Sequence, residues 1–261
     1  MDLSTGRTLR VERRRETLHV VIDRPDRDNG INDALMRELH AALDEAERDP
    51  AVRLVVVESS GPVFCSGMDL GDAADSDRAD DGLAARGGQV FYRLLERLTT
   101  LPRVVVSVVD GRVTGGGVGI AAASDFVFAS TRSSFALPEA LWGLLPCCVL
   151  PFLIRRTGFQ PAYAMTLSTL PVTAERAAGI HLVDEVTDDA RPALRRLASR
   201  LTKIDTSVVA DAKRYFEQLR QPAEHHEQAA VAEFARLMSS PAVRARIAGF
   251  AHHQQMPWEN R

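Results

Sequence analysis

The pentapeptide GGGVG at positions 115–119 decides the fold, together with the run VVVSVV at positions 104–109 that precedes it. A run of β-branched residues predicts a buried strand. Glycines that lead from such a strand into a helix let a ligand approach the backbone closely, and the first N–H groups of the helix have no partners there. The segment therefore predicts a strand, a glycine turn and a helix whose first amides can face a ligand.

The segment VFCSGMDL at positions 63–70 repeats this arrangement earlier in the chain, after a second β-branched run at 52–57. Before these, LHVVI at 18–22 predicts another buried strand. Asn32 is placed to cap an amphipathic helix that runs to about Glu47. Continuous apolar strands that alternate with helices predict sheets covered by helices, which is an α/β fold.

After residue 145 the sequence becomes mostly helical. The predicted helical segments are 149–157, 161–168, 174–180, 190–201, 208–219 and 224–251. Between them, residues 182–186 predict a short strand or an extended connection. Because the sequence has no internal repeat, we expect one fold with an α/β core at 1–195 and a helical C-terminal region at 196–261.

The composition is that of an ordinary globular protein, with 45% apolar and 26% charged residues among 261. The formal net charge of −3 gives no electrostatic reason to expect a nucleic acid or an anionic membrane as partner. The longest apolar stretch, 136–154, is interrupted by Glu139 and by prolines, which argues against a membrane-spanning helix. The N-terminal residues lack the apolar run of a signal peptide, so we expect a cytoplasmic protein.

Residues 71–88 are rich in Asp, Ala and Gly without a clear period, so we expect a mobile surface segment there. Its carboxylates lack the spacing of a calcium loop. The seven histidines and three cysteines also lack the spacing of a zinc site. We therefore predict no metal site.

Three segments carry residues suited to chemistry, namely 63–70, 115–119 and LPEALWG at 137–143. By itself the glycine run also resembles a dinucleotide-binding fingerprint. The acidic ribose ligand expected about twenty positions later is missing, because residues 131–135 read TRSSF. Close packing of a helix against a strand is a purely structural alternative for these glycines.

In this order and spacing the three segments resemble the enoyl-CoA hydratase/isomerase (crotonase) family, from residue 18 to about residue 250. The resemblance implies a crotonase fold, in which repeated ββα units form two roughly perpendicular sheets and C-terminal helices assemble a homotrimer or a dimer of trimers. It also implies that the amides of Ser66 and Gly116 hold a thioester oxygen. No separate cofactor is implied, since the substrate carries its own phosphopantetheine. The implied substrate-binding residues are Gly67, Met68, Asp69, Leu70 and Trp142.

The resemblance makes Glu139 the candidate acid/base. Hydratases of the family carry two glutamates, whereas this sequence has Gly119 at the first position and Glu139 at the second. The departure puts addition of water to a simple enoyl thioester in doubt. One carboxylate still suffices for a double-bond isomerisation or for an elimination. The structural alternative is a carboxylate that only stabilises a helix start after Pro138.

A narrower resemblance comes from residues 142–166, the DNGIND segment at 28–33 and the ending at 257–259. These stretches are similar to the dehydratases of β-branching cassettes in polyketide gene clusters. That branch removes water from a 3-hydroxy-3-methylglutaryl group on acyl carrier protein and gives a 3-methylglutaconyl thioester. The free carboxylate of such a substrate needs a cation, for which Arg155 and Arg156 are candidates. The alternatives are an enoyl-thioester isomerase and a non-catalytic thioester-binding protein.

Two remaining features carry less weight. Many coenzyme A-using relatives place a lysine near the chain end, whereas Glu259 occupies that region here, which favours a carrier-protein thioester over a phosphorylated adenosine. Cys65, Cys147 and Cys148 have no identifiable base beside them in the sequence, so we interpret them as small buried packing residues.

Overall fold

The computed structural model describes residues 2–5, 8–75, 81–219 and 226–259. Within these ranges the strands form two sheets. The larger sheet has the order β1 (Asp2–Thr5), β2 (Leu9–Arg14), β3 (Thr17–Ile22), β4 (Leu54–Ser59), β6 (Val104–Val109), β8 (Phe126–Ala129) and β11 (Glu185–Val186). The smaller sheet has the order β10 (Val172–Thr173), β9 (Ser134–Ala136), β7 (Arg112–Thr114) and β5 (Val63–Cys65).

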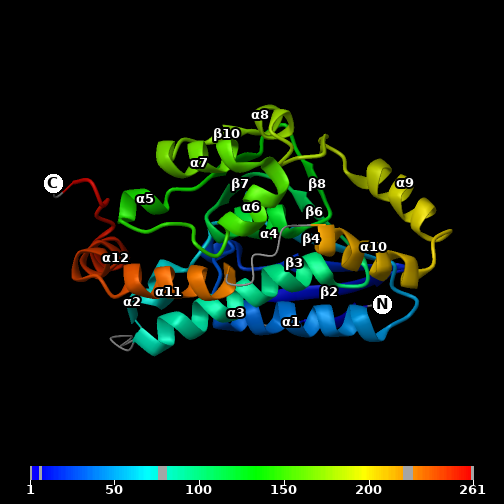
Figure 1. Cartoon of the computed structure of the whole chain (residues 1–261), viewed down its shortest axis with the longest axis horizontal. Coiled ribbons are helices and arrows are strands. Elements are labelled where there is room, and N and C mark those ends of the chain that lie inside the picture. Colours follow the sequence, from blue (N-terminus) through cyan, green and yellow to red (C-terminus); the bar gives the residue numbers. More distant parts are fainter. Residues whose placement is uncertain (1, 6–7, 76–80, 220–225, 260–261) are drawn as a thin grey trace.

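Helices pack around these sheets (Figure 1). They are η1 (Pro25–Arg27), α1 (Asp33–Arg48), α2 (Leu70–Asp75), α3 (Asp81–Thr100), α4 (Gly116–Ala123), α5 (Glu139–Trp142), α6 (Leu150–Thr157), α7 (Phe159–Ser168), α8 (Ala174–Gly179), α9 (Arg191–Leu201), α10 (Thr206–Leu219), α11 (His226–Met238) and α12 (Pro241–His253). Helices α1 and α3 run along the lower side in Figure 1, and α7 and α8 lie on the upper side. Helices α5 and α12 lie at one end of the molecule, and α9 and α10 lie at the other.

A repeated ββα unit connects the two sheets. In each unit the first strand (β4, β6 or β8) joins the larger sheet, and the second strand (β5, β7 or β9) joins the smaller one. The second strands pair in parallel, with Val63 opposite Arg112 and Arg112 opposite Ser134. Because the carboxyl ends of neighbouring parallel strands meet at one edge of a sheet, the segments after β5, β7 and β9 must converge. These are the three segments that the sequence marked for chemistry.

The central strands are buried on both faces, as their β-branched sequences predict. All of Leu54, Val55, Val56 and Val57 in β4 are at most 1% exposed. Helix α1 covers this sheet with an apolar face, and Asn32 caps it because its side chain accepts a hydrogen bond from the amide of Leu35. The strands at 18–22 and 104–109 and the helix after Asn32 are therefore confirmed.

Two expectations about local structure are wrong. The segment 71–88 is largely helical, since it holds most of α2 and the start of α3, while residues 76–80 lie outside the described part of the chain. Alanine-rich sequence favours a helix even without an amphipathic period. The segment 224–251 is divided into α11 and α12, because Pro241 cannot continue a helix from Ser240 and instead occupies the first turn of α12. The proposed division between residues 195 and 196 falls inside α9.

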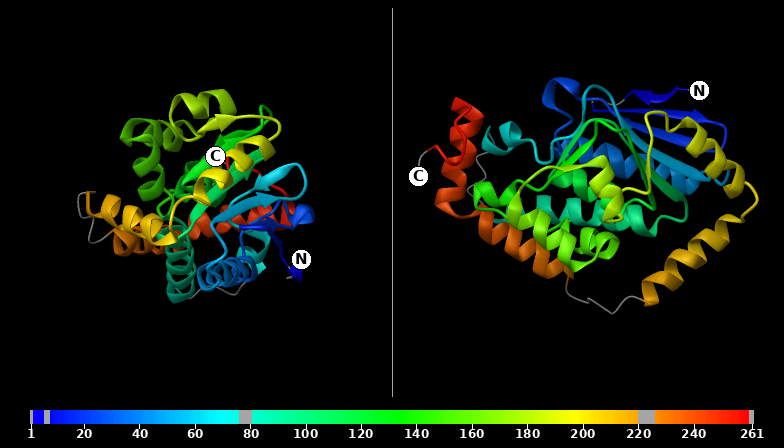
Figure 2. Two further views of the ribbon diagram at one scale, coloured as in Figure 1. Left: turned by 90° about the vertical axis from the view of Figure 1, so that its right-hand side faces the viewer. Right: turned by 90° about the horizontal axis from the view of Figure 1, so that it is seen from above.

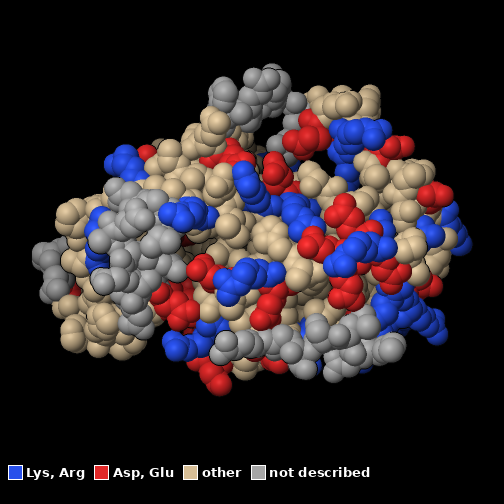
Figure 3. All heavy atoms as spheres, turned by 90° about the horizontal axis from the view of Figure 1, so that it is seen from below, with Lys and Arg blue, Asp and Glu red and all other residues tan. Residues whose placement is uncertain are grey.

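The surface is mixed in charge. Figure 3 shows basic and acidic side chains interspersed over the face seen from below, in keeping with the small net charge of −3. Among the described helices, none has the length and hydropathy needed to cross a membrane.

Candidate active site

A cavity of about 670 Å³ lies where β5, β7 and β9 end. All three predicted segments contribute to its wall, and α1, α3, α11 and α12 supply further side chains. Of the residues predicted for the site, those that line the cavity are Ser66, Gly67, Met68, Asp69, Leu70, Gly116, Glu139 and Trp142. The parallel order of the smaller sheet therefore brings the whole predicted set to one place.

Glycines allow the three segments to touch one another. Gly67 has a φ of +81°, and a Cβ atom on it would lie 3.2 Å from the amide nitrogen of Gly116. Gly115 has a φ of +55°, and a Cβ atom there would lie 3.2 Å from Oε1 of Glu139. Both backbone conformations favour glycine, and both positions have a neighbouring segment in close contact. The glycines thus hold the Gly116 amide beside the Gly67 turn and Glu139 beside both.

The amide predicted to come from Ser66 is already used. Its N–H donates to the carbonyl oxygen of Asp28 at 3.1 Å, so it does not face the cavity as a free donor. The chain after β5 runs parallel to Ile31, where the Ile31 amide donates to Gly67 and the Asp69 amide donates to Ile31. Successive amides of an extended strand point to opposite sides, so the Met68 amide points away from Ile31. Met68 therefore replaces Ser66 as the candidate donor.

The amides of Met68 and Gly116 are both without a hydrogen-bond acceptor among the described residues. Gly116 is the first residue of α4, where a helix leaves its amides unpaired. Gly116 as a free donor agrees with the sequence prediction. Two such donors on one cavity wall can bind the negative charge that develops on a carbonyl oxygen.

Glu139 is the first residue of α5, and its side chain points toward the glycine turn. Its Oε2 atom is fully buried and has no hydrogen-bond partner among the described residues. Burial raises the pKa of this carboxyl from its ordinary value of 4.5 to about 7. A carboxyl group of this kind can both accept and release a proton near neutral pH. A carboxylate that only stabilised the start of α5 would not need to lie buried in the cavity.

Gly119, at the position of the first of the two family glutamates, has no room for a side chain. A Cβ atom on Gly119 would lie 2.9 Å from Cγ2 of Val149 and 3.0 Å from Cδ1 of Leu95. Apolar side chains therefore fill the space that a second carboxylate would need. Gly119 is buried and is not part of the described cavity wall.

The Asp69 side chain forms a buried ion pair. Its carboxylate accepts a hydrogen bond from Nη2 of Arg24 at 2.9 Å, and the two side chains are only 7% and 11% exposed. The buried side chain of Asn29 donates to the carbonyl oxygen of Val63 in β5. These bonds fix the loop that carries Asp28 and Ile31 against the segment after β5. Asp69 also lines the cavity, and its contact with substrate stays a prediction.

Arg155 and Arg156 lie outside the cavity of Glu139. They line a separate cleft together with Lys213, and Arg156 donates to the carbonyl oxygens of Leu182 and Ser124. Both arginines are on the last turn of α6, which packs on α4. The prediction that these residues meet a substrate carboxylate is therefore wrong.

The cavity also contains residues that the sequence did not indicate. Cys147 and Cys148 line it, where burial raises the pKa of their thiols to about 11 and about 12. Burial likewise raises the pKa of Cys65 to about 12. Neutral thiols are poor nucleophiles, so the interpretation of the cysteines as packing residues agrees with these values. Among the residues described, no group of three or more potential ligands is arranged to hold a metal ion.

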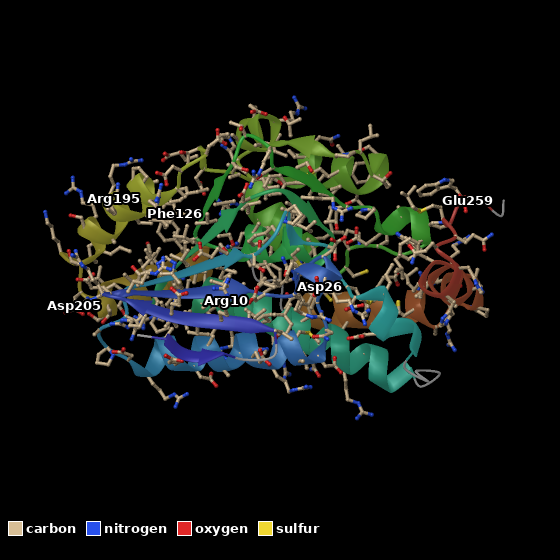
Figure 4. The ribbon with its side chains drawn as sticks, turned by 180° about the vertical axis from the view of Figure 1, so that it is seen from behind. Arg10, Asp26, Phe126, Arg195, Asp205 and Glu259 are labelled. Carbon is tan, nitrogen blue, oxygen red and sulfur yellow. The ribbon has the colours of Figure 1, made fainter. Side chains whose placement is uncertain are left out.

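Glu259 lies at the far end of the molecule, beyond α12 (Figure 4). Its carboxylate accepts a hydrogen bond from the amide of Met256 at 2.9 Å. The carboxylate therefore caps the turn formed by its own neighbours.

Comparison with known proteins adds to this geometry. The model of the family described as enoyl-CoA hydratase/isomerase matches residues 12–261. The chain belongs to this family. It is 33% identical to the bacillaene synthase dehydratase PksH of Bacillus subtilis over 260 residues, with 100% of each chain covered. It is also 30% identical to the 2,3-dehydroadipyl-CoA hydratase of Escherichia coli over 232 residues, with 88% of each chain covered.

Solved structures of the family share the fold. The crystal structure of a putative polyketide biosynthesis enoyl-CoA hydratase (pksH) from Bacillus subtilis superposes with a TM-score of 0.89 at 31% identity. The match covers 97% of this chain and 100% of that one. The predicted crotonase fold is therefore confirmed, and so is the prediction of an enzyme of the hydratase and lyase kind.

Proposed function

We propose that the enzyme removes water from a 3-hydroxy-3-methylglutaryl thioester of acyl carrier protein and forms the 3-methylglutaconyl thioester. The observation that carries the proposal is one buried, unpaired carboxyl oxygen at Glu139 beside the unpaired amides of Met68 and Gly116. The full-length similarity to a polyketide dehydratase supports the choice of reaction. The closed space at Gly119 supports a one-carboxylate reaction over the two-carboxylate hydration.

The proposed reaction begins with the thioester carbonyl oxygen bound by the amides of Met68 and Gly116. The Glu139 carboxylate removes a proton from C2, and the electron pair of the C–H bond delocalises onto the carbonyl oxygen as an enolate. Each preorganised donor stabilises that charge by about 3–4 kcal/mol in a dry site. The electron pair then forms the C2–C3 double bond while the C3–O bond breaks.

The leaving hydroxyl takes the proton that Glu139 has just acquired, and water departs. Glu139 returns to the carboxylate, so the reaction needs no second acid and no redox partner. A pKa of about 7 suits both halves of this cycle, because the group is deprotonated often enough to act as base and acidic enough to return the proton. One carboxyl group thus serves both steps on the same face of the substrate.

The proposed substrate brings its own phosphopantetheine arm, so the enzyme needs no further cofactor. The carrier protein is the proposed partner, in line with the polyketide relative. A homotrimer or a dimer of trimers is proposed as the assembly. The large exposed apolar side chains of α7 and α10 support it, since a second copy could cover them. They are Phe159, Tyr163, Leu167, Val208, Tyr215, Phe216 and Leu219.

The second candidate is double-bond isomerisation of an enoyl thioester. It is favoured by the same single carboxyl group, since Glu139 can move one proton between C2 and C4 of a bound substrate. A relative supports this option too, because the chain is 30% identical to the 1,2-epoxyphenylacetyl-CoA isomerase of Escherichia coli over 192 residues.

Mass spectrometry of loaded carrier protein tests the proposal. The enzyme is incubated with carrier protein that bears 3-hydroxy-3-methylglutaryl-phosphopantetheine, and the acyl group is expected to lose one water. Glu139→Gln is expected to abolish the loss. A mass that stays constant with folded wild-type enzyme, together with double-bond migration in an enoyl thioester, would replace dehydration by isomerisation.

A further inference from the structure

Asn29 is a fully buried polar residue that is not among the described residues lining the cavity of Glu139. It lies in the turn between η1 and α1, where Asp28 and Asn29 have φ values of +49° and +53°. Residues other than glycine rarely adopt this left-handed conformation, and Asn and Asp tolerate it best. The proposed movement of a proton by Glu139 does not use the Asn29 side chain. The burial of this side chain therefore needs a separate explanation.

The Asn29 side chain joins three parts of the backbone. Its Oδ1 atom accepts a hydrogen bond from the amide of Arg24 at 2.7 Å. Its Nδ2 atom donates to the carbonyl oxygen of Ser60 at 2.8 Å and to that of Val63 at 2.6 Å. Both hydrogens of the side-chain amide are thereby used, and its oxygen has a partner. Asn29 thus fastens the turn before α1 to the loop after β4 and to β5.

The same turn also pairs with the segment after β5. The amide of Ser66 donates to the carbonyl oxygen of Asp28 at 3.1 Å. The amide of Ile31 donates to Gly67 at 2.7 Å, and the amide of Asp69 donates to Ile31 at 2.9 Å. Figures 2 and 4 show η1 beside the segment that leads into α2. The position of the turn therefore sets how the backbone after β5 is oriented.

The direction of the Met68 amide follows from this pairing. Met68 precedes Asp69, whose amide donates to Ile31, and successive amides of an extended strand point to opposite sides. The Met68 amide is therefore a free donor only while the turn stays in register with this segment. A misplacement of about 1 Å at a reacting centre can lower the rate on the order of 100-fold. A group that fixes the turn consequently acts on the rate without touching the substrate.

We infer that Asn29 is a positioning residue for the oxyanion hole, the pair of donors formed by the amides of Met68 and Gly116. Its three hydrogen bonds are directional and buried, so they hold the turn more closely than apolar packing would. The turn in its place holds the Met68 amide where the thioester oxygen becomes negative. The inference rests on the proposed function, because it concerns the donor that the enolate requires.

The carbonyl stretching frequency of a bound thioester tests this role. The ligand 3-methylglutaryl-pantetheine has no 3-hydroxyl group to lose, and carbon-13 at its thioester carbon separates its infrared band from those of the protein. Donors that draw electron density onto the oxygen weaken the C=O bond. The band of the wild-type complex is therefore expected at a lower frequency than the band of the ligand in buffer.

Asn29→Asp is expected to lose most of this frequency shift. Aspartate keeps the size of the side chain and tolerates the left-handed φ, but it places an acceptor against the carbonyl oxygens of Ser60 and Val63. The variant is also expected to lower kcat for dehydration about 100-fold while Kd for 3-methylglutaryl-pantetheine changes less than about threefold. The two quantities separate because the amides bind the charge of the enolate more strongly than a neutral carbonyl.

Two further variants isolate the effect. Asn29→Gly takes the left-handed φ without strain and removes only the hydrogen bonds, so it is expected to lose the shift as well. Ser107→Ala is the matched control, because the Ser107 and Ser124 hydroxyls form a 2.8 Å hydrogen bond, are 0% exposed and do not line the cavity of Glu139. This control is expected to lower the melting temperature and to leave the carbonyl band and kcat unchanged.

Circular dichroism verifies the fold of all variants. The inference is overturned if both Asn29 variants keep the wild-type band, whatever their kcat, or if Ser107→Ala also loses the shift. A wild-type complex whose band stays at the frequency found in buffer would refute the oxyanion hole and the inference with it. An enzyme that shows the shift, loses it in both Asn29 variants and releases no water from the 3-hydroxy-3-methylglutaryl carrier would refute only the dehydration.

Discussion

Replacing the proposed acid/base is expected to stabilise the protein while it abolishes activity. Burial raises the pKa of Glu139 from 4.5 to about 7, so the folded state holds the proton more tightly than the unfolded state. Below pH 4.5 both states are protonated and the folded state carries no penalty. Above that pH the unfolded state loses its proton first, and stability falls until the folded carboxyl ionises near pH 7.

The magnitude follows from the size of the pKa change. One pKa unit corresponds to ~1.36 kcal/mol, so the ionised Glu139 lowers the free energy of unfolding by about 3 kcal/mol. Glutamine resembles the neutral acid in size and polarity and never ionises. Glu139→Gln is therefore expected to be more stable than the wild type by about 3 kcal/mol at pH 8 and by less than about 1 kcal/mol at pH 5.

Urea denaturation at pH 5, 7 and 8, at one protein concentration, measures this difference. Glu175→Gln on the exposed surface of α8 serves as control and is expected to change stability by less than about 1 kcal/mol at every pH. A Glu139→Gln variant that is equally stable or less stable than the wild type at pH 8 would refute the inference that the ionised carboxyl of Glu139 destabilises the folded state. A stabilisation that does not change between pH 5 and pH 8 would refute the role of ionisation.

Other consequences concern activity and packing. We expect kcat/KM for dehydration to rise about tenfold per pH unit up to pH 7 and then level off, since Glu139 must begin as a carboxylate; a flat profile from pH 5 to 8 would contradict this. Gly119→Glu is expected to gain no hydratase activity and to lower the melting temperature, because Leu95 and Val149 fill the site and overpacking costs about 1–3 kcal/mol. Arg24→Met is expected to cost about 3–5 kcal/mol in chemical denaturation by leaving Asp69 buried and unpaired, whereas a loss below about 1 kcal/mol would assign the pair no structural importance.

The local sequence predicted strands and helices correctly wherever buried apolar residues followed a regular pattern. The β-branched run of β6 and the capped helix α1 were predictable because each side chain's own surroundings match its propensity. The helices at 70–75 and 81–100 were missed, since alanine and aspartate give no hydrophobic period there. Both helices contact elements far away in the sequence, α3 with α11 and α2 with α12.

Within the candidate site, the sequence marked the glycine turns and the one carboxylate, because Gly116 and Glu139 are chemically distinctive in a short segment. It placed the first donor at Ser66, and only the tertiary structure moved that donor to Met68. Which amide is free depends on the pairing of Ile31 with this segment, a contact between residues far apart in the chain. The raised pKa of Glu139 likewise depends on burial by several elements.

The sequence by itself determined the family, the alternation of strands and helices and the choice of Glu139 as the candidate acid/base. Only the tertiary structure decided that the free amides belong to Met68 and Gly116, that Arg155 and Arg156 face another cleft, and that α11 and α12 complete the cavity. The physical reason is range. Propensity and periodicity act over one or two turns of chain, whereas hydrogen-bond saturation, burial and charge proximity depend on segments that meet only in the folded molecule.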